Sequence, residues 1–197
     1  MTKLLAEISG KGKALCLIVL CLMILAITCY GCAEKKETAS KEPASKETVS
    51  CELLEKLPGD IAKPIQINYG NKIKLVGVTS KKLSAGQWTV SYYWQPLDEL
   101  GQFNQVFVHF VDTNNNILFQ NDYPFCQKKS FMEMKGKYVK ETYSIAVPQT
   151  AMGKESSLKV GIFALEAKGL PRIKIESAEG GTKEDDSTAA IVDKLNF

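Results

Sequence analysis

The hydrophobic and polar positions divide the chain into three stretches. Residues 14–27 form an unbroken apolar run, and residues 33–50 contain Lys, Glu, Ser, Thr and Ala with Val49 as their one large apolar residue. Over residues 51–197, short apolar and polar runs alternate between breaks rich in Gly, Pro, Asn and Ser. Alternation with a period of two is typical of strands that bury one face. The pattern therefore predicts a β-rich domain over residues 51–197.

The clearest predicted strand covers residues 87–95. Four large apolar residues alternate there with mostly polar ones: Trp88, Val90, Tyr92 and Trp94. Side chains at alternate positions share one face of a strand, so this face should pack in the core. Pro96 follows and ends the strand, because proline donates no hydrogen bond to a neighbouring strand.

A hairpin is predicted next along the chain. Residues 103–112 contain a continuous apolar run, which is typical of a strand covered on both faces, and residues 117–120 return after the turn-forming residues 113–116. A short helical turn is expected over residues 51–57. Further strands are expected at residues 65–69, 72–78, 137–147, 157–165, 172–175 and 189–195.

Eight or nine short strands without a long helical pattern indicate an all-β fold. The architecture expected is an antiparallel β-sandwich, either immunoglobulin-like or of jelly-roll type. An up-and-down barrel is less favoured because the hairpins are not regularly spaced along the chain.

The start of the chain has the features of an export signal. Three lysines within the first thirteen residues precede the apolar run, which is shorter than the roughly 20 residues that span a bilayer. Gly31 and Cys32 then resemble the bacterial lipobox, although Cys29 stands where that motif usually has leucine. The resemblance implies cleavage before Cys32 and lipid attachment there. The alternative is an uncleaved membrane anchor, and both place the domain outside the cytoplasmic membrane.

Residues 32–50 are expected to form a disordered tether behind the lipid. Their composition offers too little apolar surface to offset the chain entropy lost on folding. In lipoproteins of enteric-type bacteria, an aspartate after the lipidated cysteine favours retention in the inner membrane. Ala33 and Glu34 follow Cys32 here, so the resemblance favours the outer membrane if the organism has one. The predicted organisation is a signal peptide at residues 1–31, the lipidated tether at residues 32–50 and the β-sandwich at residues 51–197.

The segments WTVSYYWQP, FNQVFVHFVDTNNNILFQNDYP and VGIFALEAKGLPRI resemble a β-sandwich module appended to membrane-embedded bacterial glycosyltransferases. The resemblance covers roughly residues 73–195 and implies a sandwich fold without a known catalytic residue. It rests on apolar strand positions and on Asp112, Gln120, Asp122, Pro124, Gly161, Gly169 and Arg172.

Charge and cysteine content narrow the range of partners. The net charge is +3, most of it from the signal region, and acidic and basic residues are interspersed, so no nucleic-acid partner is expected. Once Cys32 carries lipid, Cys51 and Cys126 are the two cysteines left in the mature chain. The compartment outside the membrane is oxidising, which favours a disulfide between them, with two separate thiols as the alternative.

The sequence offers little for catalysis or metal binding. His109 is the only histidine and is expected to be a satisfied core residue, and His109, Cys51 and Cys126 are too few ligands to favour zinc. Asp112 begins a stretch like a calcium loop, but Ile117 and Tyr123 stand where an EF-hand needs glycine and glutamate, so a turn is expected. We therefore predict a protein without enzymatic activity, metal or cofactor.

A noncatalytic binding role remains. Tyr93 and Tyr123 lie outside the apolar stripe of residues 87–95, and Gln95 and Asp122 stand close to them in the sequence. Exposed rings flanked by polar side chains bind sugars, so these four residues are the candidate ligand site, with envelope carbohydrate as the ligand. The alternative is a structural or assembly lipoprotein whose sandwich docks an envelope protein.

Overall fold

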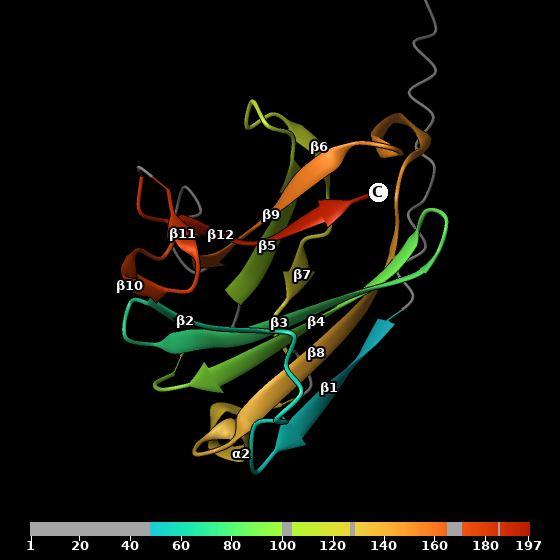
Figure 1. The fold of residues 1–197 in the computed structure, drawn as a ribbon. Coiled ribbons are helices and arrows are strands. Elements are labelled where there is room, and N and C mark those ends of the chain that lie inside the picture. The colour runs from blue at the N-terminus through green and yellow to red at the C-terminus, as the bar shows by residue number, and fades with distance from the viewer. Residues whose placement is uncertain (1–47, 100–103, 127–128, 165–170, 185) are drawn as a thin grey trace, which may run out of the picture. The chain divides into compact units, whose positions relative to one another are not determined.

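The computed structural model describes residues 48–99, 104–126, 129–164, 171–184 and 186–197. Two antiparallel sheets lie face to face, one above the other in Figure 1. Their strands are β1 (Thr48–Leu54), β2 (Lys63–Tyr69), β3 (Ile73–Ser84), β4 (Gln87–Pro96), β5 (Asn104–Val111), β6 (Ile117–Gln120), β7 (Tyr123–Pro124), β8 (Tyr138–Ala146), β9 (Glu155–Ala164), β10 (Ile175–Glu179), β11 (Thr182–Lys183) and β12 (Ala189–Asn196).

Sheet A has the strand order β1-β8-β4-β3-β2-β10, and sheet B has the order β11-β12-β9-β5-β6, with β7 also paired to β5. All of these pairs are antiparallel. The prediction of an all-β antiparallel sandwich is confirmed. The continuous apolar run of β5 also has the predicted place inside its sheet, between β9 and β6.

The core lies between the two sheets. The alternating large residues of β4 point into it, since Val90, Tyr92 and Trp94 are fully buried and Trp88 is nearly so. Sheet B contributes alternate residues of β5 and β9 to the same core: Val106, Val108, Phe110, Leu158, Val160 and Ile162. The period of two in these strands therefore has the packing cause inferred from the sequence.

The prediction of a helical turn over residues 51–57 is wrong. Residues 48–54 form β1, whose Cys51 pairs with Glu141 on β8. Residues 51–54 lie in continuous register with β8, and the hydrogen bonds to this neighbour stabilise a strand, whereas an isolated helical turn is unstable by itself. The strand also begins at Thr48, inside the stretch predicted as tether.

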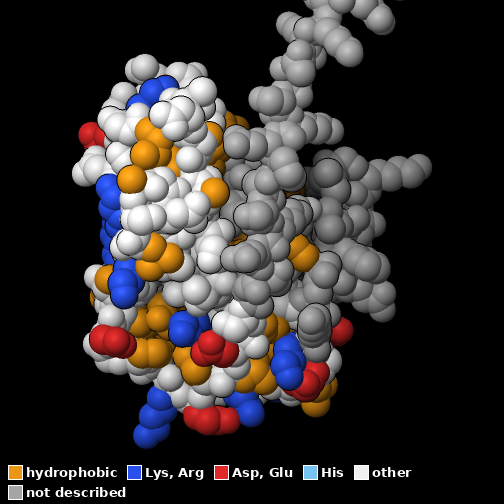
Figure 2. All heavy atoms as spheres, turned by 90° about the vertical axis from the view of Figure 1, so that its right-hand side faces the viewer, with side chains coloured by type: hydrophobic (Ala, Val, Ile, Leu, Met, Phe, Trp, Pro, Cys, Tyr) orange, Lys and Arg blue, Asp and Glu red, His pale blue; other side chains and the backbone are white. Residues whose placement is uncertain are grey.

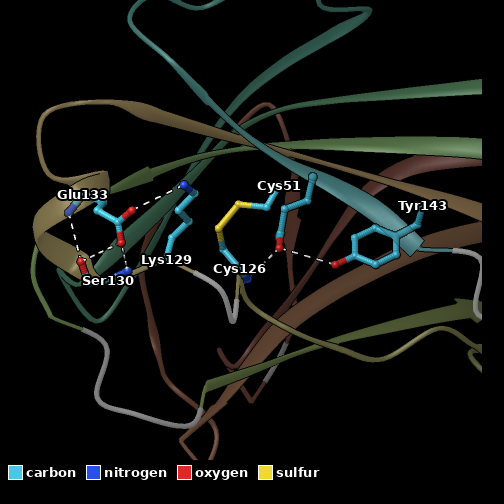
Figure 3. The surroundings of a disulfide bond; sticks show 7 residues. Cys51, Cys126, Lys129, Ser130, Glu133 and Tyr143 are labelled. Carbon is cyan, nitrogen blue, oxygen red and sulfur yellow. Dashed lines mark hydrogen bonds and ion pairs between the residues drawn. A yellow bond between two sulfur atoms is a disulfide. The ribbon is translucent and has the colours of Figure 1, made fainter.

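The prediction for residues 172–175 holds only in part, because Arg172 makes an isolated bridge to Phe163 and the strand β10 begins at Ile175. Among the described residues, α2 (Phe131–Met134) is the one α-helix, and a 3-10 turn lies at η1 (Gln149–Ala151). Ser130 caps α2 and its backbone N–H donates to Glu133, a capping box visible in Figure 3. Within the described part of the chain, no helix has the length and apolar character to cross a membrane.

Several charged side chains on the described surface lie beside partners of opposite sign. On β1 and β8, Lys140 Nζ lies 3.6 Å from Glu52 Oε2, and Lys137 Nζ lies 3.0 Å from Glu55 Oε1 just beyond β1. The face in Figure 2 likewise shows acidic and basic side chains close together at its lower end. Such exposed pairs contribute little to the free energy of folding.

Candidate functional site

Tyr93 does not offer an accessible ring. It lies on the face of sheet A that points away from the core, yet only 6% of its surface is exposed. The chain between β1 and β2 passes over this face, where Ile61 and Tyr93 both lie against Gly77. The prediction of an exposed platform at Tyr93 is therefore wrong, because a crossing segment covers a face that the strand pattern alone leaves open.

Tyr123 is also buried, with 4% of its surface exposed. Its ring stacks on that of Tyr143 with 4.0 Å between centroids and lies 5.7 Å from that of Tyr92. It belongs to the core between the sheets, so the prediction of an accessible ring is wrong here too. The aromatic cluster of the core extends further along the chain than the stripe of β4 indicated.

Asp122 has a structural task at the junction of β6 and β7. Its Oδ1 accepts a hydrogen bond of 2.9 Å from the backbone N–H of Val108, and the N–H of Asn121 donates to the carbonyl of Val108. These bonds continue the hydrogen bonding of β5 at the point where its neighbouring strand changes from β6 to β7. Gln95 lies half-buried on sheet A, opposite Lys74. The four predicted ligand residues are therefore not brought together on one face.

A different set of polar and aromatic side chains gathers on the face of sheet B that points away from the core. We call this set the His109 face: Phe107, His109, Gln120, Lys159, Phe163 and Arg172. Gln120 on β6, His109 on β5 and Lys159 on β9 are direct neighbours across three strands. Sequence analysis placed His109 in the core, whereas the structure places it beside these polar groups.

The floor of the His109 face is the ring of Phe107. It is fully buried although it points away from the core, because it lies across Gly161, where a Cβ atom would clash with the ring. The ring of Phe163 packs beside it at 4.8 Å, and the guanidinium of Arg172 lies 4.8 Å above it. A cation over an aromatic face is attracted by the electron density of the ring. These contacts give Gly161 and Arg172 a structural role: Gly161 leaves room for the Phe107 ring, and Arg172 covers that ring.

Lys159 is the buried cation of this face, with 8% of its surface exposed. Its Nζ lies 2.6 Å from Glu184 Oε1, before β12, and 2.8 Å from Asn115 Oδ1 in the β5–β6 turn. Asn115 adopts the left-handed conformation that asparagine tolerates, and Asp112 fixes the turn by accepting the N–H groups of Asn114 and Asn116. The predicted turn after Asp112 is confirmed.

His109 lies between Phe107 and Asp122. Its Nε2 is 3.9 Å from Asp122 Oδ1, and its ring centroid is 5.2 Å from that of Phe107. Partial burial lowers the pKa of His109, against an opposing contribution from Asp122. The imidazole is therefore neutral at neutral pH, and a neutral imidazole can donate one hydrogen bond and accept another.

Arg172 is held from its other side by Asp186. Arg172 Nη1 lies 3.5 Å from Asp186 Oδ2, and the backbone N–H and the hydroxyl of Thr188 both donate to the same carboxylate. These hydrogen bonds keep the pKa of Asp186 below its usual value. The guanidinium is thus fixed over the aromatic floor while it remains partly exposed.

This arrangement can recognise a polar ligand. The face offers a neutral imidazole, an exposed amide, a fixed guanidinium and the half-buried ring of Phe163. Phe107 beneath them is fully buried, so Phe163 is the aromatic ring that an apolar ligand surface can reach. Among the described residues, no group of three or more His, Cys, Asp or Glu could hold a metal ion. The period of two could have placed His109, Phe107 and Lys159 on one face, but the sequence alone did not show that Arg172 and Glu184 return to it.

The disulfide joins Cys51 on β1 to Cys126, with 5.7 Å between their Cα atoms (Figure 3). Cys32, the predicted lipid site, lies outside the described residues, as do the predicted signal peptide and residues 32–47 of the tether. No protein-family model matches the chain, and no curated protein or solved structure matches it.

Proposed function

We propose that this chain is a lipid-anchored envelope protein that binds a carbohydrate of the cell envelope on the His109 face without catalysis. The observation that carries the proposal is the row of Gln120, His109 and Lys159 on the same face as the half-buried ring of Phe163. Sugars present hydroxyl groups next to apolar C–H faces, and a site for them needs both kinds of surface.

The balance of charges on this face favours a neutral or weakly charged ligand. Lys159 is paired with Glu184, Arg172 with Asp186, and His109 lies near Asp122. A strongly anionic ligand would have to displace these carboxylates, whereas hydroxyl groups can bond to the hydrogens and lone pairs that remain.

The anchoring part of the proposal rests on the sequence. The lysine-bearing start, the short apolar run and Gly31-Cys32 support export and lipidation, which would hold the sandwich at the outer side of the membrane. The sequence resemblance to modules of membrane-embedded glycosyltransferases supports an envelope glycan as the ligand.

A glycan array followed by calorimetry on the full-length processed protein in detergent tests the proposal. We expect binding of an envelope polysaccharide, weakened at least tenfold by Gln120→Ala, which removes an exposed side chain from the His109 face. Gln66→Ala is the matched control, because Gln66 is an exposed glutamine on sheet A and its loss should leave affinity unchanged.

Failure to bind any envelope polysaccharide would overturn the carbohydrate proposal. If a specific envelope protein is then captured, and Gln120→Ala weakens that capture, the assembly role takes its place.

A further inference from the structure

Glu141 is a carboxyl group in the middle of the apolar core. It lies on β8 with 1% of its surface exposed, at a position whose side chain points between the sheets. Tyr92 on β4 is its direct neighbour on one side, and Cys51 on β1 is its neighbour on the other. The disulfide therefore lies against this carboxyl.

The hydrogen bonds of Glu141 lead to the second half of that disulfide. Its Oε1 accepts the backbone N–H of Cys126 at 2.8 Å and the hydroxyl of Tyr143 at 3.5 Å. Its Oε2 is buried without a partner. Three neighbouring side chains also carry buried polar atoms without partners among the described residues: Tyr92, Trp94 and Tyr123.

No cation balances this carboxyl. The titratable groups that face Glu141 are the phenols of Tyr92 on β4, Tyr123 on β7 and Tyr143 on its own strand. Among the described residues, Glu141 forms no ion pair. A charged carboxylate in such surroundings is costly, because burial removes its hydration. Burial accordingly raises the pKa of Glu141 to about 7.

We propose that the Glu141 carboxyl is a proton-controlled latch on residues 123–126, closed when protonated and loosened when ionised, so that pH controls access of a reductant to the Cys51–Cys126 disulfide. The protonated carboxyl keeps its carbonyl oxygen on the N–H of Cys126, and its O–H can donate to a neighbouring phenol oxygen. The ionised carboxyl has no hydrogen to donate, and the neighbouring N–H and phenol donors offset the cost of its lost hydration only in part. Water admitted by an opening of the segment stabilises the charge further.

Residues 123–126 end in a strained backbone conformation, which favours their movement once the bond to Glu141 weakens. Cys126 has a φ of 34°, in the left-handed region that a residue with a Cβ atom rarely adopts, and the bond to Glu141 helps to hold it there. Only 3% of Cys126 is exposed, whereas Cys51 is half-buried, so the closed form shields the disulfide on the Cys126 side. Movement of residues 123–126 would admit water to Glu141 and reductant to the disulfide together.

The sign of the pH effect follows from the two states of the carboxyl. The closed form holds the proton with a pKa of about 7, whereas a hydrated carboxyl has the ordinary value of 4.5. The closed form is therefore fully favoured below about pH 4.5 and loses that advantage as the pH rises through 7. Between pH 5.5 and pH 8.5, these two values shift the opening equilibrium by about thirtyfold.

Reduction of the native full-length protein by a water-soluble phosphine tests the latch. The phosphine supplies two electrons, water supplies the oxygen of the phosphine oxide, and the two sulfurs leave as thiols. Rates are normalised to a small disulfide in the same buffer. We expect reduction about thirtyfold faster at pH 8.5 than at pH 5.5 in the unsubstituted protein. A flat profile is expected in Glu141→Gln, which mimics the protonated carboxyl.

Glu52→Gln is the matched control, because Glu52 is an exposed carboxyl next to Cys51 and its variant should keep the steep profile. Equal profiles in the unsubstituted protein and Glu141→Gln would overturn the proposal. If Glu141→Gln fails to fold, hydrogen exchange of the Cys126 amide in the unsubstituted protein decides. Greater protection at pH 5.5, after correction for intrinsic exchange, supports the latch, and equal protection at both pH values refutes it.

Discussion

At the scale of single residues, Gly161 sets how closely β9 and the ring of Phe107 can approach. The tip of the outward-pointing ring lies over this position, and the carbonyl oxygen of Thr188 borders the same space. No side chain fits without moving the ring. The floor of the His109 face therefore depends on the absence of one methyl group.

We predict that Gly161→Ala destabilises the fold by about 2–3 kcal/mol, because the new methyl group overpacks a closed site. Denaturant unfolding measures the change. Gly59→Ala is the control, since a Cβ atom at Gly59 meets nothing within 4 Å, and it should leave the unfolding midpoint nearly unchanged. A Gly161→Ala midpoint equal to that of the control would show that the ring of Phe107 can move without cost.

Residue roles were harder to predict than strand positions. The period of two placed Trp88 and Tyr92 in the core correctly, because burial of alternate side chains is a local property of a strand. The same rule predicted an exposed Tyr93, because the alternation within one strand carries no information about the distant segment that brings Ile61 to this face. Glu141 was visible as a charged residue at an inward position of β8, and that conflict with an apolar core was the signal for it.

At the scale of elements, β1 shows how pairing can override a local pattern. Its leucines suggested a helical turn, but β8 offers a free edge, and the disulfide fixes the register at Cys51. Strand order and the segments that cross a sheet depend on contacts between distant residues. The sequence therefore predicted most of the longer strands and the sandwich, but not which strands are neighbours. Only the hairpin of β5 and β6 could be paired from the sequence, because its turn is local.

We predict that loss of the disulfide weakens β1 first. Replacing Cys51 and Cys126 together by serine opens a loop with a sequence separation of 75 residues. The chain-entropy description gives a loss of about 4 kcal/mol for a loop of that length. Thermal unfolding measures the loss, and hydrogen exchange should locate the largest increase in β1. Unchanged exchange in β1, with increases spread evenly over both sheets, would contradict a local role for the bond.

At the scale of the whole molecule, the proposed anchor determines where the sandwich works. We predict that the mature chain begins at Cys32 and carries lipid there, because Gly31-Cys32 follows a charged start and a short apolar run. Cys32→Ala should block processing and leave the longer precursor in the membrane. Intact-mass measurement of the membrane-bound protein provides the readout. Cys29→Ala is the matched control and should be processed normally, and an unmodified Cys32 in the mature membrane-bound protein would contradict the prediction.

The position of the disulfide within β1 has a mechanical consequence. A pull on the N-terminal side of the chain enters the sandwich at Thr48 and could peel β1 from β8 one residue at a time. Such peeling stops at Cys51, where the covalent bond passes the load to Cys126 and so to the segment next to the core. From there the force acts on the packed aromatic rings together, as shear across the interior. An oxidised sandwich would therefore resist tension on its N-terminal side far better than a reduced one.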